Sequence, residues 1–175
     1  MQFYDYEKND FAGEKGRDAS FLDMVNEDKI QNFLKSKIGQ EMATAFKDKS
    51  LYREYKFMRL FSQEEIEKYR IDFGIINAND RVTIKGAGEH QVIIQGIIDA
   101  FYVKEEASKK SIVLVDYKTD GLSSKKPNES KLTESLIDAY GIQLKIYEDV
   151  LKELTGYDVS KKYIYSFALD KEIEL

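Results

Sequence analysis

Two aspartates and one lysine stand where apolar runs of the sequence end. Asp99 follows Ile97 and Ile98, and Asp116 and Lys118 follow the run 112–115, which is Ile-Val-Leu-Val. Carboxylates in such positions can hold a divalent cation, which activates a water and polarises a phosphoryl oxygen. A neighbouring ammonium can orient that water or stabilise charge that builds on a phosphate. These residues therefore predict metal-assisted phosphoryl chemistry.

The spacing within the second run decides which side chains meet. Side chains of a strand alternate between its two faces. Asp116 and Lys118 are therefore expected on one face, and Tyr117 on the other. An apolar run of this kind is typical of a central strand that is buried on both faces.

The partner strand brings the other aspartate into place. If residues 104–111 form the loop of an antiparallel hairpin, Val103 faces Ile112 and Asp99 faces Asp116. Opposite positions place Cβ atoms about 4.5–5.5 Å apart. A slip of one residue would send Asp99 to the other face. We expect the two carboxylates on one patch of the sheet.

Two carboxylates at such a distance repel each other unless positive charge lies between them. Lys118 can offset one charge, and a divalent cation can offset both. Oxygen ligands without cysteine or paired histidines favour Mg²⁺ or Mn²⁺ over Zn²⁺. The alternative for these three residues is an ordinary surface ion pair.

The elements that must position these residues follow from periodicity. The chain is expected to form one domain. Residues 1–25 are expected to be irregular, and the core to lie at about residues 28–170. The predicted helices are 28–46, a short one opened by Ser62, and 134–154, which ends before Gly156. The predicted strands are 51–60, 81–85, 91–103, 111–118 and 162–168, with a turn at Gly86 and Gly88 and a loop over 120–133. This order predicts an α/β fold with a central mixed sheet flanked by helices.

Composition excludes several classes of protein. The absence of cysteine excludes disulfides, zinc–thiolate sites and iron–sulfur clusters. No apolar run is long enough to span a membrane and the first residues are polar, so a cytoplasmic protein without a membrane partner is expected. The net charge of −5 argues mildly against nucleic acid. Cations bound to a carboxylate site would make it locally positive.

Three segments together resemble a known family. Gln95–Asp99 and Val115–Asp120 resemble the G-x-(I/V)-D and D-Y-K-(T/S)-D motifs of RecB-like nucleases, which belong to the PD-(D/E)XK superfamily. Gln143–Tyr147 resembles their Q-x-x-x-Y motif. Residues 38–40 and 52–57 resemble segments that precede these motifs in the C-terminal nuclease domains of AddA-type (RexA-type) subunits. The resemblance covers about residues 29–168.

The resemblance implies a restriction-endonuclease-like fold and a nuclease that cuts DNA with Mg²⁺ or Mn²⁺. The roles it implies are metal binding by Asp99 and Asp116, catalysis by Lys118, a metal-bound backbone carbonyl at Tyr117, and support of the site and the DNA by Gln143 and Tyr147. Glu54 shares a strand face with Lys56 and is a candidate further acid; its alternative is an ordinary ion pair.

Two family features have no match. The family's metal-binding histidine lies upstream of the first strand, whereas the only histidine, His90, directly precedes the strand of Asp99 and is expected on a surface turn. A G-x-x-x-x-G-K-[ST] phosphate loop is also missing. The resemblance then implies a piece of a larger ATP-dependent helicase–nuclease that acts in double-strand-break repair and recombination with a second, AddB-like (RexB-like) subunit. By itself such a piece is expected to bind metal weakly and to cut DNA poorly.

Two alternatives remain beside this interpretation. A Cas4-like nuclease is opposed by the absence of the cysteines that hold an iron–sulfur cluster in those enzymes. A non-catalytic DNA-binding or assembly module with the same fold is opposed by the presence of Asp99, Asp116 and Lys118 together.

Overall fold

The computed structural model describes residues 3–5, 10–12, 27–69, 82–87, 91–122 and 128–175. The strands are β1 (Phe3–Asp5), β2 (Asp10–Ala12), β3 (Leu51–Ser62), β4 (Val82–Ala87), β5 (Gln91–Glu106), β6 (Lys109–Lys118), β7 (Asp158–Ser166) and β8 (Lys171–Glu174). The helices are α2 (Glu27–Lys35), α3 (Lys37–Lys47), α4 (Gln63–Tyr69) and α5 (Glu129–Thr155). In the part of the chain that the structure describes, no helix is both long and apolar enough to cross a membrane.

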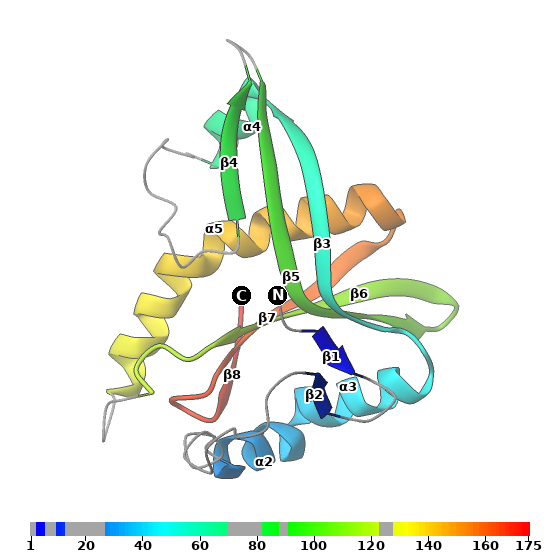
Figure 1. Ribbon diagram of the computed structural model, residues 1–175, viewed down its shortest axis with the longest axis vertical. Coiled ribbons are helices and arrows are strands. Elements are labelled where there is room, and N and C mark those ends of the chain that lie inside the picture. Colours follow the sequence, from blue (N-terminus) through cyan, green and yellow to red (C-terminus); the bar gives the residue numbers. More distant parts are fainter. Residues whose placement is uncertain (1–2, 6–9, 13–26, 70–81, 88–90, 123–127) are drawn as a thin grey trace.

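A six-stranded mixed sheet forms the centre of the molecule (Figure 1). Its order is β3-β5-β6-β7-β8, and β4 also pairs with β5. All neighbours are antiparallel except β6 and β7, which run parallel. Parallel neighbours need a long crossover, and α5 provides it. The predicted α/β fold with a mixed sheet is confirmed.

Helices cover the two faces of this sheet with separate apolar layers. One layer joins α5 to the sheet and includes Leu144, Tyr147, Ile98, Leu114 and Ile164. The other joins α3 to the opposite face and includes Ile38, Met42, Ala100, Val115 and Tyr163. Strand β6 contributes to both layers and is buried on both faces, as its apolar run predicts.

The helix predicted over residues 28–46 is two helices. Ser36 interrupts it as the N-cap of α3, where its Oγ accepts a hydrogen bond from the backbone N of Gly39 at 3.1 Å. Gly39 also lies against the preceding helix, since a Cβ at this position would be 2.0 Å from the carbonyl oxygen of Phe33. The apolar period continues across this break, so periodicity alone predicted one helix.

The hairpin between β5 and β6 is tighter than predicted. The predicted pair of Val103 and Ile112 is confirmed, but pairing continues to Glu106 and Lys109. The predicted loop over 104–111 is therefore wrong, because only Ala107 and Ser108 form the turn. The polar side chains of this segment lie on parts of the two strands that are exposed to solvent, where polarity alone predicts a loop.

Ala107 and Ser108 offer a test of this turn. Both have a positive φ, of 48° and 68°, a conformation that Asn-Gly adopts at lower cost in two-residue hairpins. The double variant Ala107→Asn, Ser108→Gly is expected to raise the midpoint of thermal unfolding by about 2–4 °C. Ser111→Gly, placed within β6, is the control and should lower that midpoint. An unchanged midpoint in the double variant would contradict the turn geometry.

Two other expectations about the ends of elements are confirmed, and a third is wrong. Ser62 Oγ accepts from the backbone N of Glu65 and Glu65 accepts from that of Ser62, so a capping box opens α4. Gly156 ends α5 with a φ of 73°. Helix α5 begins earlier than predicted because Asn128 caps it by accepting from the backbone N of Lys131.

Further differences lie near the chain ends, at β7 and at one glycine. The strand predicted over 162–168 is β7, which begins and ends earlier, at Asp158 and Ser166. Residues 3–5 and 10–12 pair as a two-stranded sheet, so the prediction that 1–25 is irregular is wrong for them. Strand β8 was not predicted, and its buried Ile173 extends the core past residue 170. Gly86 lies within β4 and not in a turn. Gly88, His90 and part of the loop over 120–133 lie outside the described residues.

Candidate active site

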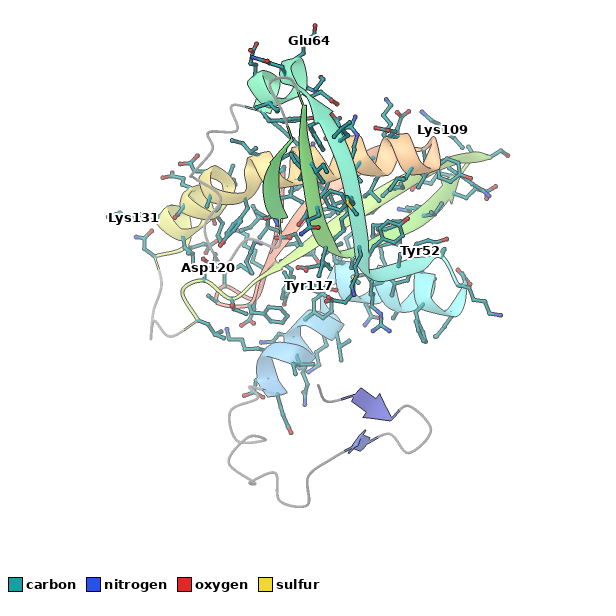
Figure 2. The ribbon with its side chains drawn as sticks, turned by 45° about the horizontal axis from the view of Figure 1, so that its top comes forward. Tyr52, Glu64, Lys109, Tyr117, Asp120 and Lys131 are labelled. Atoms are coloured by element: carbon teal, nitrogen blue, oxygen red, sulfur yellow. The ribbon has the colours of Figure 1, made fainter. Side chains whose placement is uncertain are left out.

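Asp116 and Lys118 form an ion pair at the end of the central strand β6. Their Oδ2 and Nζ atoms are 2.7 Å apart, and the side chain of Asp116 is 3% exposed. Tyr117, between them, lies on the opposite face, where its ring packs edge-on against Phe33 at 5.4 Å and its hydroxyl contacts Met42. Figure 2 shows Tyr117 on the side of α2. The predicted division of the three side chains between two faces is confirmed.

Asp99 lies against the same segment of β6. Its Oδ2 accepts a hydrogen bond from the backbone N of Tyr117 at 2.9 Å, and the residue is 6% exposed. That nitrogen is bonded to the carbonyl carbon of Asp116, so the Asp99 carboxylate reaches the Asp116–Tyr117 peptide. The strand ladder ends at the pair of Ala100 and Val115, which are the chain neighbours of Asp99 and Asp116. Two buried carboxylates therefore flank one point where β5 and β6 separate.

The backbone is irregular at Asp99 and at the residue across from it. The pairs on either side are Arg53 with Ala100 and Tyr55 with Ile98, which places Glu54 opposite Asp99. Glu54 has a φ of 50°, which side-chain-bearing residues rarely adopt. Ile98 and Ala100, two residues apart, pack into different apolar layers. The strand therefore changes the face it presents at Asp99, and Glu54 is exposed beside it.

The negative charge of Asp99 affects the pKa of Tyr117. Burial raises the pKa of the Tyr117 phenol to about 12, and the negative charge of Asp99 adds to the rise. Glu54 acts in the same direction, and Arg53 opposes it. The phenol is therefore protonated at neutral pH, and its role on this face is packing.

Helix α5 supports the lysine through a chain of hydrogen bonds. Lys118 Nζ donates to Gln143 Oε1 at 3.3 Å, and Gln143 Nε2 donates to the hydroxyl of Tyr147 at 2.7 Å. The Tyr147 hydroxyl in turn donates to the carbonyl of Ile97 at 3.1 Å, two residues before Asp99. Because residues four apart share a helix face, one stripe of α5 joins Lys118 to the strand of Asp99.

Two residues outside the predicted set of site residues lie near Lys118. The Nζ of Lys118 lies 3.8 Å from the centroid of the Tyr140 ring, and the Tyr140 hydroxyl donates to Asp120 Oδ1 at 3.0 Å. Figure 2 shows Asp120 where the chain leaves β6. Tyr140 precedes Gln143 by three residues, so their common helix face was the available signal.

The donor set fits a small, hard cation. Asp99, Asp116 and the carbonyl of Tyr117 would supply oxygen atoms only. Over the described ranges, no three histidine, cysteine or acidic side chains gather into a cation site. Mg²⁺ commonly takes one or two carboxylates and completes its coordination with waters and substrate phosphate, so two carboxylates are sufficient for it.

Comparisons with known proteins show which family the chain resembles. The family model of the PD-(D/E)XK nuclease superfamily matches residues 3–173. The A subunit of an ATP-dependent helicase/nuclease from Clostridium perfringens (strain SM101 / Type A) is 38% identical over 153 residues, which is 87% of this chain and 10% of that protein. Proteins of the same description from Clostridium novyi (strain NT) and Clostridioides difficile (strain 630) are 36% and 31% identical, over 87% and 86% of this chain. The chain spans about a tenth of the length of each of these three relatives.

Proposed function

Because the chain belongs to the PD-(D/E)XK nuclease superfamily, as a nuclease domain similar to that of the helicase/nuclease relatives, we propose that it hydrolyses DNA phosphodiester bonds with Mg²⁺ or Mn²⁺. The observation that carries this proposal is the placement of three groups at the end of β6. The buried Asp99 carboxylate bonds to the peptide after Asp116, and Asp116 is paired with Lys118 at 2.7 Å.

Each group of the site has a proposed task. Asp99, Asp116 and the carbonyl of Tyr117 would hold the cation. When bound, a divalent cation polarises a phosphoryl oxygen and lowers the pKa of a water. Lys118 would orient the attacking water or neutralise charge on the phosphate. Gln143 holds the lysine from α5 by the hydrogen bond between its Oε1 and the ammonium.

The exposed Glu54 has a weaker case as a further acid. It lies opposite Asp99 on β3, and its charge contributes to raising the pKa of Tyr117. We propose that Glu54 adds negative potential beside the cation, without a place in the minimal donor set.

The relatives suggest the wider context of this activity. Their name describes one subunit of an ATP-dependent enzyme that is both a helicase and a nuclease. We propose that this domain degrades DNA that such a helicase unwinds, in repair and recombination, together with an AddB-like (RexB-like) subunit. The cytoplasm is the proposed location.

A cleavage assay tests the proposed function. The chain in excess over end-labelled linear DNA should cut it slowly with Mn²⁺ or Mg²⁺, and not at all with EDTA. Asp116→Ala should remove the activity at either cation. Cleavage that persists in EDTA or in Asp116→Ala, or no cleavage above the EDTA control, would overturn the proposal and favour a non-catalytic module.

A further inference from the structure

We propose that Tyr140 is a positioning residue that holds Lys118 through the face of its aromatic ring. This inference rests on the proposed nuclease function of the site. An ammonium over a ring face is attracted by the negative potential of the π system, most strongly within about 6 Å of the centroid. The Nζ of Lys118 lies 3.8 Å from the Tyr140 centroid, well within that range.

Among the residues that the structure describes, three groups lie next to the ammonium of Lys118. Asp116 Oδ2 is 2.7 Å from Nζ, Gln143 Oε1 is 3.3 Å away, and the Tyr140 ring is the third neighbour. A lysine ammonium has three N–H donors on a flexible stem of four carbons. A carboxylate, an amide oxygen and a ring face together contact the ammonium at the end of that stem.

The ring itself is held from two sides. Tyr140 lies on α5, about two helical turns before Tyr147. Its hydroxyl donates to Asp120 Oδ1 at 3.0 Å. Asp120 follows Lys118 by two residues in the chain. The contact therefore connects α5 to the end of β6 at the lysine.

The ring matters because Asp116 has two proposed tasks. Its carboxylate pairs with Lys118, and it is also a proposed ligand of the cation. Any charge that Asp116 shares with a cation weakens its attraction for the ammonium. The attraction of the Tyr140 ring does not depend on Asp116, so it keeps the ammonium in place when that carboxylate is shared.

Kinetics of Tyr140 variants test this role. Tyr140→Leu should lower the single-turnover cleavage rate about 5- to 10-fold at saturating DNA, as expected for losing one partly buried ring–ammonium contact. Tyr140→Phe keeps the ring and should stay within about twofold of the wild type. In a Lys118→Ala background, Tyr140→Leu should cause no further loss. Ile137→Ala, at a 38% exposed position on α5, is the control for lost apolar bulk.

A second measurement does not depend on cleavage. In NMR spectra of the chain, the ring current of Tyr140 should shift the ε-methylene protons of Lys118 upfield. Tyr140→Phe should keep this shift, and Tyr140→Leu should remove it. Tyr140→Met repeats the test with a longer side chain if leucine prevents folding.

The outcomes separate the two proposals. If the wild type shows no cleavage that depends on Asp116, the proposed function fails, and the Lys118 shift alone decides whether Tyr140 positions the lysine. If the wild type cuts and Tyr140→Leu cuts equally fast, only the role of Tyr140 is overturned. A Lys118 shift that survives in Tyr140→Leu, or an equal loss of rate in Tyr140→Phe and Tyr140→Leu, also overturns it.

Discussion

Lys118→Ala is expected to reduce DNA cleavage by about 100- to 1,000-fold while it leaves cation binding intact. In its proposed role the ammonium stabilises charge only as the phosphate reacts, so its loss should lower the rate of the chemical step. It also lies 2.7 Å from Asp116 Oδ2, where it competes with a cation for that carboxylate. Mn²⁺ affinity should therefore stay unchanged or rise slightly in the variant.

Two measurements on the same protein distinguish this role from a structural one. Single-turnover cleavage of end-labelled DNA gives the rate, and a Mn²⁺ titration gives the affinity. Lys145→Ala, which removes an exposed lysine from α5, is the matched control and should change neither. A Lys118→Ala variant that cuts at the wild-type rate would remove the lysine from the mechanism. Loss of Mn²⁺ binding would show that it supports the fold of the site.

Two substitutions of Asp99 should distinguish the effect of its charge from the effect of its hydrogen bond. Its carboxylate accepts from the backbone N of Tyr117 at 2.9 Å in a buried environment. Asp99→Ala leaves that N–H without this acceptor, which should lower the free energy of unfolding by about 1–3 kcal/mol. Asp99→Asn keeps an oxygen acceptor and removes the charge. It should retain most of the stability, and both variants should lose Mn²⁺ binding and cleavage.

Urea unfolding and Mn²⁺ titration of the two variants test this separation. Asp158→Asn, which removes an exposed carboxylate at the start of β7, is the control for a general loss of charge. Equal destabilisation by alanine and asparagine at position 99 would contradict the role of the hydrogen bond. Cleavage by Asp99→Asn at the wild-type rate would show that this aspartate is not part of the cation site.

Local patterns were sufficient to predict which faces of the sheet the Asp116, Tyr117 and Lys118 side chains occupy. Strand alternation placed Asp116 and Lys118 on one face and Tyr117 on the other, because the run before them is apolar on both faces. Hairpin symmetry gave the correct pairing of Val103 with Ile112, since any symmetric shortening of a loop keeps the same register. The error in loop length therefore did not change the register, although pairing ends at Ala100 and Val115, one residue short of the predicted pair of Asp99 with Asp116.

Long-range contacts could not be predicted in the same way. The hydrogen bond from the Tyr117 amide to Asp99 exists because β5 and β6 separate at that point, and the positive φ of Glu54 accompanies the change. Neither feature is signalled by a periodic pattern in the sequence. The contact of Tyr140 with Lys118 depends on how α5 crosses the sheet after a loop, which propensities do not determine.

The most direct test is a Mn²⁺ titration, followed by electron paramagnetic resonance, of the wild type, Asp99→Asn, Asp116→Asn and the double variant. If one cation is shared by both carboxylates, the wild type binds Mn²⁺, even weakly, and each single variant binds it at least about tenfold less tightly. The double variant should then be little worse than either single one. Wild-type binding that equals that of the double variant would show that these two aspartates do not hold a common ion.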